Sequence, residues 1–337
     1  MPQIDTQLCK DAGIDIPLIC GAMYPCSNPE LVAAASAAGG LGIIQPMSLT
    51  FVHKYGMREG IRYIRSLTNN PVGFNAIVEK TVKAYDKRMQ NWIDIALEEG
   101  VRFFITALGD PGWVVRKVEA TGGVVYHDVT ERKWALKAID SGVKGLICVN
   151  ASAGGHAGAL AAQTLYDSLA DLGLPLVCAG GIGDGPGFVR ALDQGYAGVQ
   201  MGTRFIATTE CNAHDDYKQA ILKAKAEDIV LSDKISGVPC AIIRTPYIEK
   251  VGTKAGPIAR WLLRGRRTKK WMRTFYSLTS IWQLRKASQK GMSYKDYWAA
   301  GKSVGAIGEV VPAAEVYREV LDAYRQAHSP KQVREST

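Results

Sequence analysis

One histidine, His156, has the surroundings of a residue that could do chemistry. It lies within AGGHAG, residues 153–158, directly after an apolar run that is typical of a β-strand. Glycines on both sides allow a flat ligand to approach closely, and imidazole titrates near neutral pH, so His156 could take or give a proton. Ser152 has no G-x-S-x-G elbow and no thiol adjoins His156, which disfavours covalent catalysis. The alternative is a loop histidine that only bonds the backbone.

A second chemical feature is a pair of glycine-ended strands within residues 175–205. One apolar run ends at Gly180 and Gly181, and the next strand ends at Gly202 and Thr203. Glycine lets backbone N–H groups come close to a ligand, and the helix start that follows adds partial positive charge. Two such strand ends side by side predict a phosphate-binding site.

Two other interpretations of these glycines compete with a phosphate site. They could simply close tight turns. They could also form a dinucleotide-binding fingerprint, but the glycines from Gly181 to Gly187 are too evenly spaced for G-x-G-x-x-G. The following strand also ends without the acidic residue that would hold a ribose, so we set this fingerprint aside.

The elements that must position these residues repeat a strand-then-helix theme. Eight strands are predicted, at 17–23, 41–46, 72–77, 102–108, 124–129, 145–150, 175–181 and 198–205. Helices are predicted at 29–38, 58–67, 86–99, 112–120, 131–141, 163–172, 187–194 and 215–228. Such alternation implies parallel pairing with right-handed crossovers, and eight units predict an α/β fold of the TIM (β/α)8 barrel type.

In such a barrel the chemistry lies at the carboxyl ends of the strands. Asn75 ends the third strand and could hydrogen-bond a cofactor edge. His127 and Asp128 end the fifth, where His127 could touch a cofactor ring or phosphate and Asp128 could orient it. The alternative for Asn75 is that it only forms a turn. The alternative for His127 and Asp128 is that they only make structural hydrogen bonds.

The alternation stops near residue 230, which predicts two parts: a barrel over 1–229 and a mainly helical, basic C-terminal cap over 230–337. Helices are expected at 258–263, 269–285, 294–300 and 313–326. Residues 254–302 hold thirteen of the Lys and Arg residues and one acid, and four of the seven tryptophans. The cap could contribute to a substrate cleft and bind a phosphate group or an acidic carrier protein, or it could merely present a solvated basic face.

Composition narrows the class of protein. The 47% hydrophobic and 22% charged content is ordinary for a globular chain, and no apolar run is long enough for a membrane span. The start lacks the apolar core of a signal peptide, so we expect a cytoplasmic protein. Seven cysteines without metal-ligand spacing predict free thiols and no metal site.

Five motifs occurring in a consistent order over residues 14–220 resemble the nitronate monooxygenase family, formerly called 2-nitropropane dioxygenases. The motifs are Gly21-Ala22-Met23, Gly73-Phe74-Asn75, Gly154-Gly155-His156-x-Gly158, Ala179-Gly180-Gly181-Ile182 and Gln200-Met201-Gly202-Thr203-Arg204-Phe205. The same family includes FMN-dependent enoyl-ACP reductases and NADH:quinone reductases.

The resemblance implies an FMN-binding barrel. The phosphate would lie on Gly180, Gly181, Gln200, Met201, Gly202 and Thr203, and the flavin near Ala22, Met23 and Asn75, with His156 facing its reactive side. Departures occur where many members carry Glu at the position of Ser152, and where some carry Lys near Asp128. These departures bear on the substrate pocket.

Three functions follow as hypotheses. The first is a nitronate monooxygenase that oxidises alkyl nitronates with O₂ to a carbonyl compound and nitrite. The second is an NAD(P)H-dependent reductase, or a dehydrogenase, of acyl-CoA or acyl-ACP thioesters, which the basic cap favours. The third is a non-redox phosphate-binding or nucleic-acid-binding protein. The expected partners are a small-molecule substrate and a second copy of the chain in a homodimer, with no nucleic acid.

Overall fold

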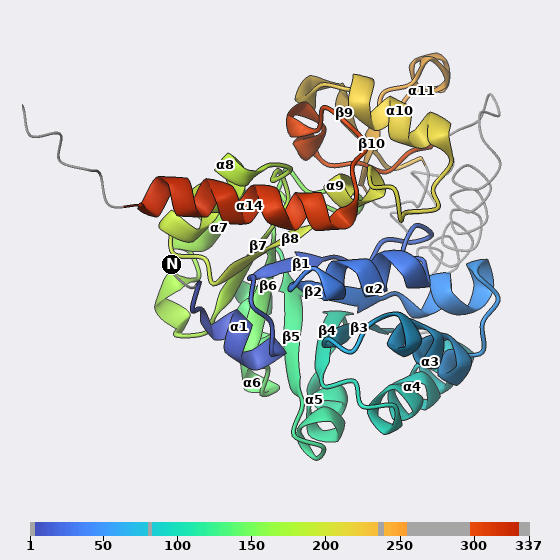
Figure 1. Cartoon of the computed structure of the whole chain (residues 1–337), viewed down its shortest axis with the longest axis vertical. Helices are drawn as coiled ribbons and strands as arrows, with labels where there is room; N and C mark the ends of the chain where they lie inside the picture. Colours follow the sequence, from blue (N-terminus) through green and yellow to red (C-terminus); the bar gives the residue numbers. More distant parts are fainter. Residues whose placement is uncertain (1–3, 80–82, 235–238, 255–296, 330–337) are drawn as a thin grey trace, which may run out of the picture.

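The computed structural model describes residues 4–79, 83–234, 239–254 and 297–329 (Figure 1). Eight parallel strands close into a barrel in chain order, which confirms the predicted fold class. They are β1 (Leu18–Cys20), β2 (Leu41–Ile44), β3 (Val72–Val78), β4 (Phe103–Leu108), β5 (Val124–Val129), β6 (Gly145–Val149), β7 (Leu176–Ala179) and β8 (Gly198–Met201).

The strands are buried on both faces, as parallel strands covered by helices must be. Alternate residues form an inner cluster that fills the barrel, namely Ile19, Leu41, Ile43, Phe103, Ile105, Tyr126, Ile147, Val177 and Ala179. The residues between them face the helices. Helix α1 (Gln7–Ala12) closes the amino-terminal end of the barrel, with Leu8 in the inner cluster and the Tyr126 hydroxyl donating to Asp11 Oδ2 at 2.8 Å.

Helices surround the barrel between successive strands (Figure 1). They are α2 (Pro29–Ala37), α3 (Met57–Leu67), α4 (Lys83–Glu98), α5 (Gly112–Glu119), α6 (Arg132–Asp140), α7 (Ala162–Asp167) and α8 (Gly185–Asp193). A π-helix, η1 (Ser48–Val52), precedes α3, and a short 3-10 turn, η2 (Ala170–Leu172), follows α7. The seven helices that the sequence predicts between strands are therefore present, but the one predicted at 163–172 ends at Asp167, and η2 covers 170–172.

The eighth helix of the ring differs from the prediction. That place is taken by α14 (Ala313–His328), which packs against α8 and α2. Its Tyr317 hydroxyl donates to Leu18 O at 3.3 Å, and a Cβ at Gly40 would lie 2.6 Å from the same carbonyl. Helix α10 (Asp215–Lys223) and the turn η3 (Ala226–Asp228), predicted as the eighth helix, lie above the barrel (Figure 1). The predicted boundary at residue 229 assigns α14 to the cap, whereas α14 packs against the helices of the barrel.

The part of the chain after β8 also contains a small sheet that the sequence analysis missed. Strands β9 (Ile229–Ser232) and β10 (Cys240–Ile243) pair antiparallel. A helix α9 (Thr203–Ile206), a helix α11 (Pro246–Val251) and a 3-10 turn η4 (Lys302–Ala306) complete this part. The helix expected at 294–300 is wrong for 297–300, because Ala299 instead forms an antiparallel bridge to Ile242. The helices expected at 258–263 and 269–285, and nearly all of the basic segment, lie outside the described residues.

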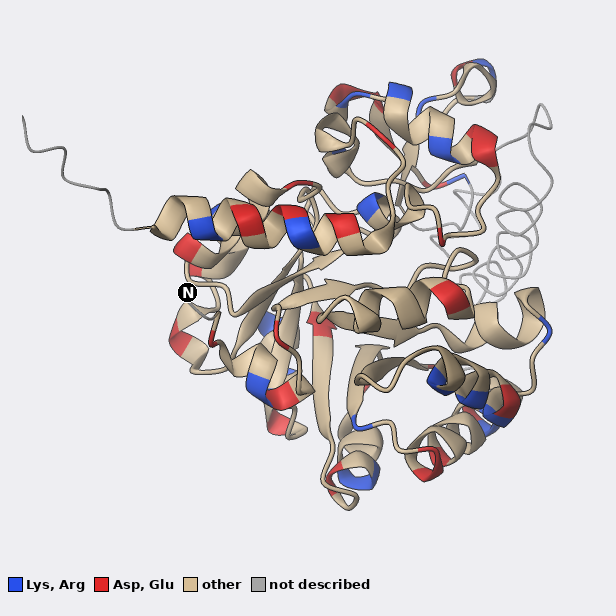
Figure 2. Ribbon diagram, in the orientation of Figure 1, with Lys and Arg blue, Asp and Glu red and all other residues tan. Residues whose placement is uncertain are grey.

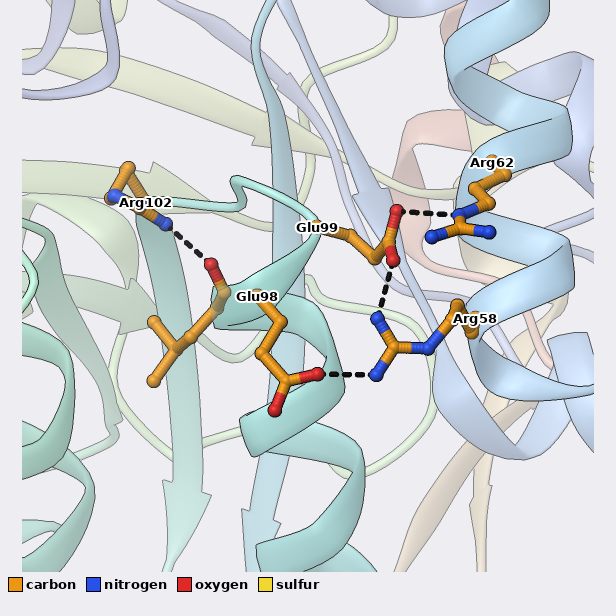
Figure 3. A network of polar contacts seen from close by, with 6 residues as sticks. Arg58, Arg62, Glu98, Glu99 and Arg102 are labelled. Carbon is orange, nitrogen blue, oxygen red and sulfur yellow. Dashed lines mark hydrogen bonds and ion pairs between the residues drawn. The ribbon is translucent and has the colours of Figure 1, made fainter.

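Charged residues lie mainly on the outer helices and loops (Figure 2). One group joins α3 to the end of α4, where Arg58 pairs with Glu98 and Glu99, and Arg62 Nε donates to Glu99 at 3.0 Å (Figure 3). The adjacent Arg102 donates to Leu97 O at 2.8 Å. These contacts bridge neighbouring helices at the surface, away from the carboxyl ends of the strands, and we assign them a structural role.

Candidate active site

The two glycine-ended strands lie side by side, as the sequence predicts. β7 pairs with β8 with Ala179 opposite Gln200, so the residues after these strands share one edge of the barrel. Gly180 and Gly181 have φ values of +123° and +81°, a region that side chains rarely adopt. Glycine is therefore required at both positions by conformation as well as by close approach.

Asn150 holds the turn after β7 against the loop after β6. It is fully buried, its Nδ2 donates to Gly180 O at 2.9 Å, and its Oδ1 accepts from Ser152 N at 2.8 Å. A Cβ at Gly180 would lie 2.6 Å from Ala153 N. The structure thus brings the loop that carries His156 into contact with the glycine turn. Sequence reasoning noted Asn150 only as a strand end and gave it no role.

The C-terminal part clamps the other side of the His156 loop. Ala241 N in β10 donates to Gly155 O at 2.7 Å, and Lys302 N donates to Ser152 O at 2.9 Å. Cβ atoms built at Gly154 and Gly301 would each lie 2.8 Å from backbone nitrogen of the other residue. The loop is therefore positioned by residues about 90 to 150 positions later in the chain, which only a three-dimensional structure reveals.

His156 itself is exposed at the edge of this site. Partial desolvation of the imidazole lowers the pKa of His156 below its usual value of 6.5. The imidazole is consequently neutral at pH 7 and able to accept a proton.

The alternation of side chains along the strands sorts the other candidates. Asn75 and Gln200 share the inward face with the inner cluster, and Ala22 packs against that cluster. His127 and Met201 lie on the opposite face of their strands. Met201 belongs to the core between barrel and helices, and His127 Nδ1 lies 2.8 Å from Thr106 Oγ1.

Because the His127 side chain faces the helices, we do not propose it as a cofactor contact. Burial lowers the pKa of His127 to about 4, which fits a neutral ring bonded to a threonine hydroxyl. The alternative of a structural hydrogen bond describes this residue.

Met23, Gly202 and Thr203 come together where β1 meets β8. A Cβ at Gly202 would lie 3.6 Å from Met23 Sδ, which is ordinary contact. Thr203 Oγ1 accepts from Gly301 N at 3.0 Å, so this threonine also ties the C-terminal part to the site.

Two buried oxygens at this end of the barrel have no hydrogen-bond partner among the described residues. They are Gln200 Oε1 and Asp128 Oδ1. Burial raises the pKa of Asp128 to about 7. Unpartnered buried oxygens cost free energy unless a ligand supplies a donor, so they point to a binding site at the mouth of the barrel.

All seven cysteines are free, as predicted, and buried. Within the described ranges, no group of three metal-ligating side chains occurs, and no helix is long and apolar enough to cross a membrane.

Comparison with known proteins agrees with this geometry. A family model described as nitronate monooxygenase matches residues 5–322. The chain belongs to the nitronate monooxygenase family. It is an oxidoreductase of that type, and the resemblance carried by the five sequence motifs is confirmed.

Similar proteins within this family carry different activities in their names. A (3aS,4S,5R,7aS)-5-hydroxy-7a-methyl-1-oxo-octahydro-1H-indene-4-carboxyl-CoA dehydrogenase of Rhodococcus jostii is 32% identical over 77% of this chain and 72% of its own. A probable nitronate monooxygenase of Staphylococcus saprophyticus is 27% identical over 74% of this chain and 81% of its own. The structure of FabK from Thermotoga maritima has a TM-score of 0.79 and 26% identity, covering 96% of this chain and 97% of FabK.

Members of this family are generally flavin-dependent, and the site has features that suit such a cofactor. The glycines after β7 and β8 would let backbone N–H groups approach a bound phosphate closely. The buried oxygens of Gln200 and Asp128 could accept hydrogen bonds from a ligand. Flavin chemistry therefore fits the residues present.

Proposed function

We propose that the protein is an FMN-dependent nitronate monooxygenase that oxidises alkyl nitronates with O₂ to a carbonyl compound and nitrite. The observation that supports it best is the juxtaposition of the β7 and β8 glycine ends with the His156 loop, held together through Asn150. This arrangement would provide an anion-binding edge beside an acid–base group, and the family model, nitronate monooxygenase, supports that function.

The roles of the chain's residues follow from their placement. Backbone at Gly180, Gly181, Gly202 and Thr203 would hold the phosphate, while Asn75 and Gln200, on the inward face of β3 and β8, would bond the ring. Bound FMN would supply the two-electron redox chemistry and the reaction with O₂. With a nitroalkane, the neutral His156 would take the proton from the carbon next to the nitro group; with a nitronate, which has already lost that proton, it would hydrogen-bond the anion.

The absorbance spectrum of the purified protein, followed by turnover with propionate 3-nitronate, tests this proposal. We expect a flavin spectrum, O₂ uptake and nitrite release without any nicotinamide. A colourless protein that does not take up FMN would refute the cofactor assignment. A yellow protein that releases no nitrite would refute the reaction while leaving the cofactor in place.

A second candidate is a flavin-dependent reductase or dehydrogenase of CoA or ACP thioesters, with NAD(P)H as reductant in the reductive direction. The specific observation that favours it is the identity of 32% and 30% to two carboxyl-CoA dehydrogenases, above the 27% and 25% to probable nitronate monooxygenases. A thioester also acidifies the C–H bond of its α-carbon, so the same neutral His156 would serve as the base that removes that proton.

Two measurements separate the candidates. Anaerobic titration with NADPH and NADH should bleach the flavin rapidly only in a reductase, and CoA esters should perturb the flavin spectrum only in a thioester enzyme. Nitrite release with neither response would favour the monooxygenase. Homodimer formation stays a prediction, which sedimentation would test.

A further inference from the structure

Asp128 is the only Asp, Glu, Lys or Arg in the eight strands of the barrel, all of which lie in described parts of the chain. It is next to last in β5. Tyr126, two residues earlier, belongs to the inner cluster, whereas Val125 and Val129 belong to the core facing the helices. Asp128 therefore points into the barrel, at its carboxyl end.

The surroundings of this carboxyl are incomplete. Its Oδ1 is shut away from solvent and has no hydrogen-bond partner among the described residues, and the same holds for Gln200 Oε1 on β8. Asp128 as a whole is only half-buried, so part of the side chain remains open at the mouth. Leaving such oxygens unpartnered costs free energy. A ligand that offers hydrogen-bond donors would remove this cost.

Among the residues that the structure describes, the titratable groups around Asp128 supply no cation at neutral pH. Cys148 lies on β6, and burial raises its thiol pKa, with a smaller contribution from the charge of Asp128. His127 faces the other side of β5 with its pKa lowered to about 4, and the pKa of His156, on the loop after β6, is lowered as well. Asp110, beyond β4, acts on His127. Burial without a compensating charge favours the neutral carboxylic acid, and it raises the pKa of Asp128 to about 7.

A neutral carboxylic acid has one O–H donor and one carbonyl acceptor side by side. The pyrimidine end of a flavin ring carries the complementary pair, an N–H donor next to a carbonyl acceptor. A carboxylate could accept from the N–H but would also face the negative end of the carbonyl dipole. The protonated form is therefore the better match for that edge.

We propose, resting on the FMN assignment of the proposed function, that Asp128 binds the imide edge of the flavin ring as a neutral carboxylic acid. Its O–H donates to a ring carbonyl, and its Oδ1 accepts the neighbouring ring N–H. Asp128 is a cofactor-binding residue under this proposal, and ionisation of its carboxyl weakens FMN binding. Gln200 Oε1 is a second acceptor at the same mouth.

The test is the dissociation constant of FMN for apoprotein, measured by quenching of flavin fluorescence at pH 6.5 and pH 8.5. For the unchanged chain we expect the Kd to rise roughly tenfold or more over this range, because the protonated fraction falls through the pKa. For Asp128→Asn we expect tight binding with a much smaller change, since the amide offers the same donor and acceptor at either pH. Asp128→Leu should bind more weakly at both.

The matched control is Asp110→Asn, which removes an exposed carboxylate beyond the neighbouring strand. It should keep the pH dependence of the unchanged chain, and titration of the FMN phosphate contributes equally to every variant. If the unchanged chain and Asp128→Asn show the same pH dependence, the assignment of Asp128 is overturned while the proposed function stands. If no variant takes up FMN, the proposed function fails and this assignment with it.

Discussion

Replacing Gly301 with alanine should displace the His156 loop. A Cβ at this position would lie 2.7 Å from Ser152 O and 2.8 Å from Gly154 N. Ordinary contact begins at 3.4 Å, so backbone must move by about 0.6–0.7 Å. Both neighbours are backbone atoms, which cannot rotate away as a flexible side chain could.

The expected magnitude follows from the hydrogen bonds at this junction. Gly301 N donates to Thr203 Oγ1 at 3.0 Å and Lys302 N donates to Ser152 O at 2.9 Å. Weakening two such bonds should reduce the free energy of unfolding by about 1–3 kcal/mol. Misplacing a catalytic group by about 1 Å can cost roughly 100-fold in rate, so a shift of this size should lower kcat by about 10-fold or more.

The assay combines urea unfolding, FMN affinity and kcat with the substrate that the proposed function identifies. Gly308→Ala is the matched control, because a Cβ at Gly308 would meet nothing within 4 Å. We expect that control to leave all three quantities unchanged. If Gly301→Ala also left kcat and the free energy of unfolding unchanged, the C-terminal clamp would not position the His156 loop.

Three further predictions concern the site. His156→Ala should retain FMN and lower turnover by roughly 100-fold or more, measured by steady-state kinetics. In the unchanged enzyme, kcat/KM should fall only below about pH 6.5, since the lowered pKa of His156 keeps the imidazole in its base form at higher pH. Asn150→Ala should lower the free energy of unfolding by about 1–3 kcal/mol in urea titrations, because Ser152 N and Gly180 O lose their partner; wild-type stability would contradict this. Because the pKa of Asp128 is raised in the folded state, the folded apoprotein should lose stability as the pH rises from about 4 to 7. At pH 8 the Asp128→Asn apoprotein should therefore have a free energy of unfolding at least about 1 kcal/mol above that of the unchanged chain. Equal unfolding midpoints would refute an uncompensated carboxylate.

Much of the architecture was determined by the sequence alone. Eight short apolar runs, each followed by a helical pattern, indicate parallel strands covered by helices, and eight such units favour the closed barrel that is observed. The glycines after β7 also marked the end of that strand correctly, since few other residues accept the φ values found at Gly180 and Gly181.

Only the tertiary structure decided which distant segments complete the barrel and the site. The apolar stripe of α14 fits between α8 and α2, but no local pattern says that this helix, and not α10, closes the ring. Side chains alternate between the two faces of a strand, so a shift of one residue in β5 would turn His127 inward in place of Asp128. The sequence does not say which of the two alternatives holds. The contacts of Gly301 and β10 with the His156 loop join residues far apart in the chain, and such packing is set by the whole fold.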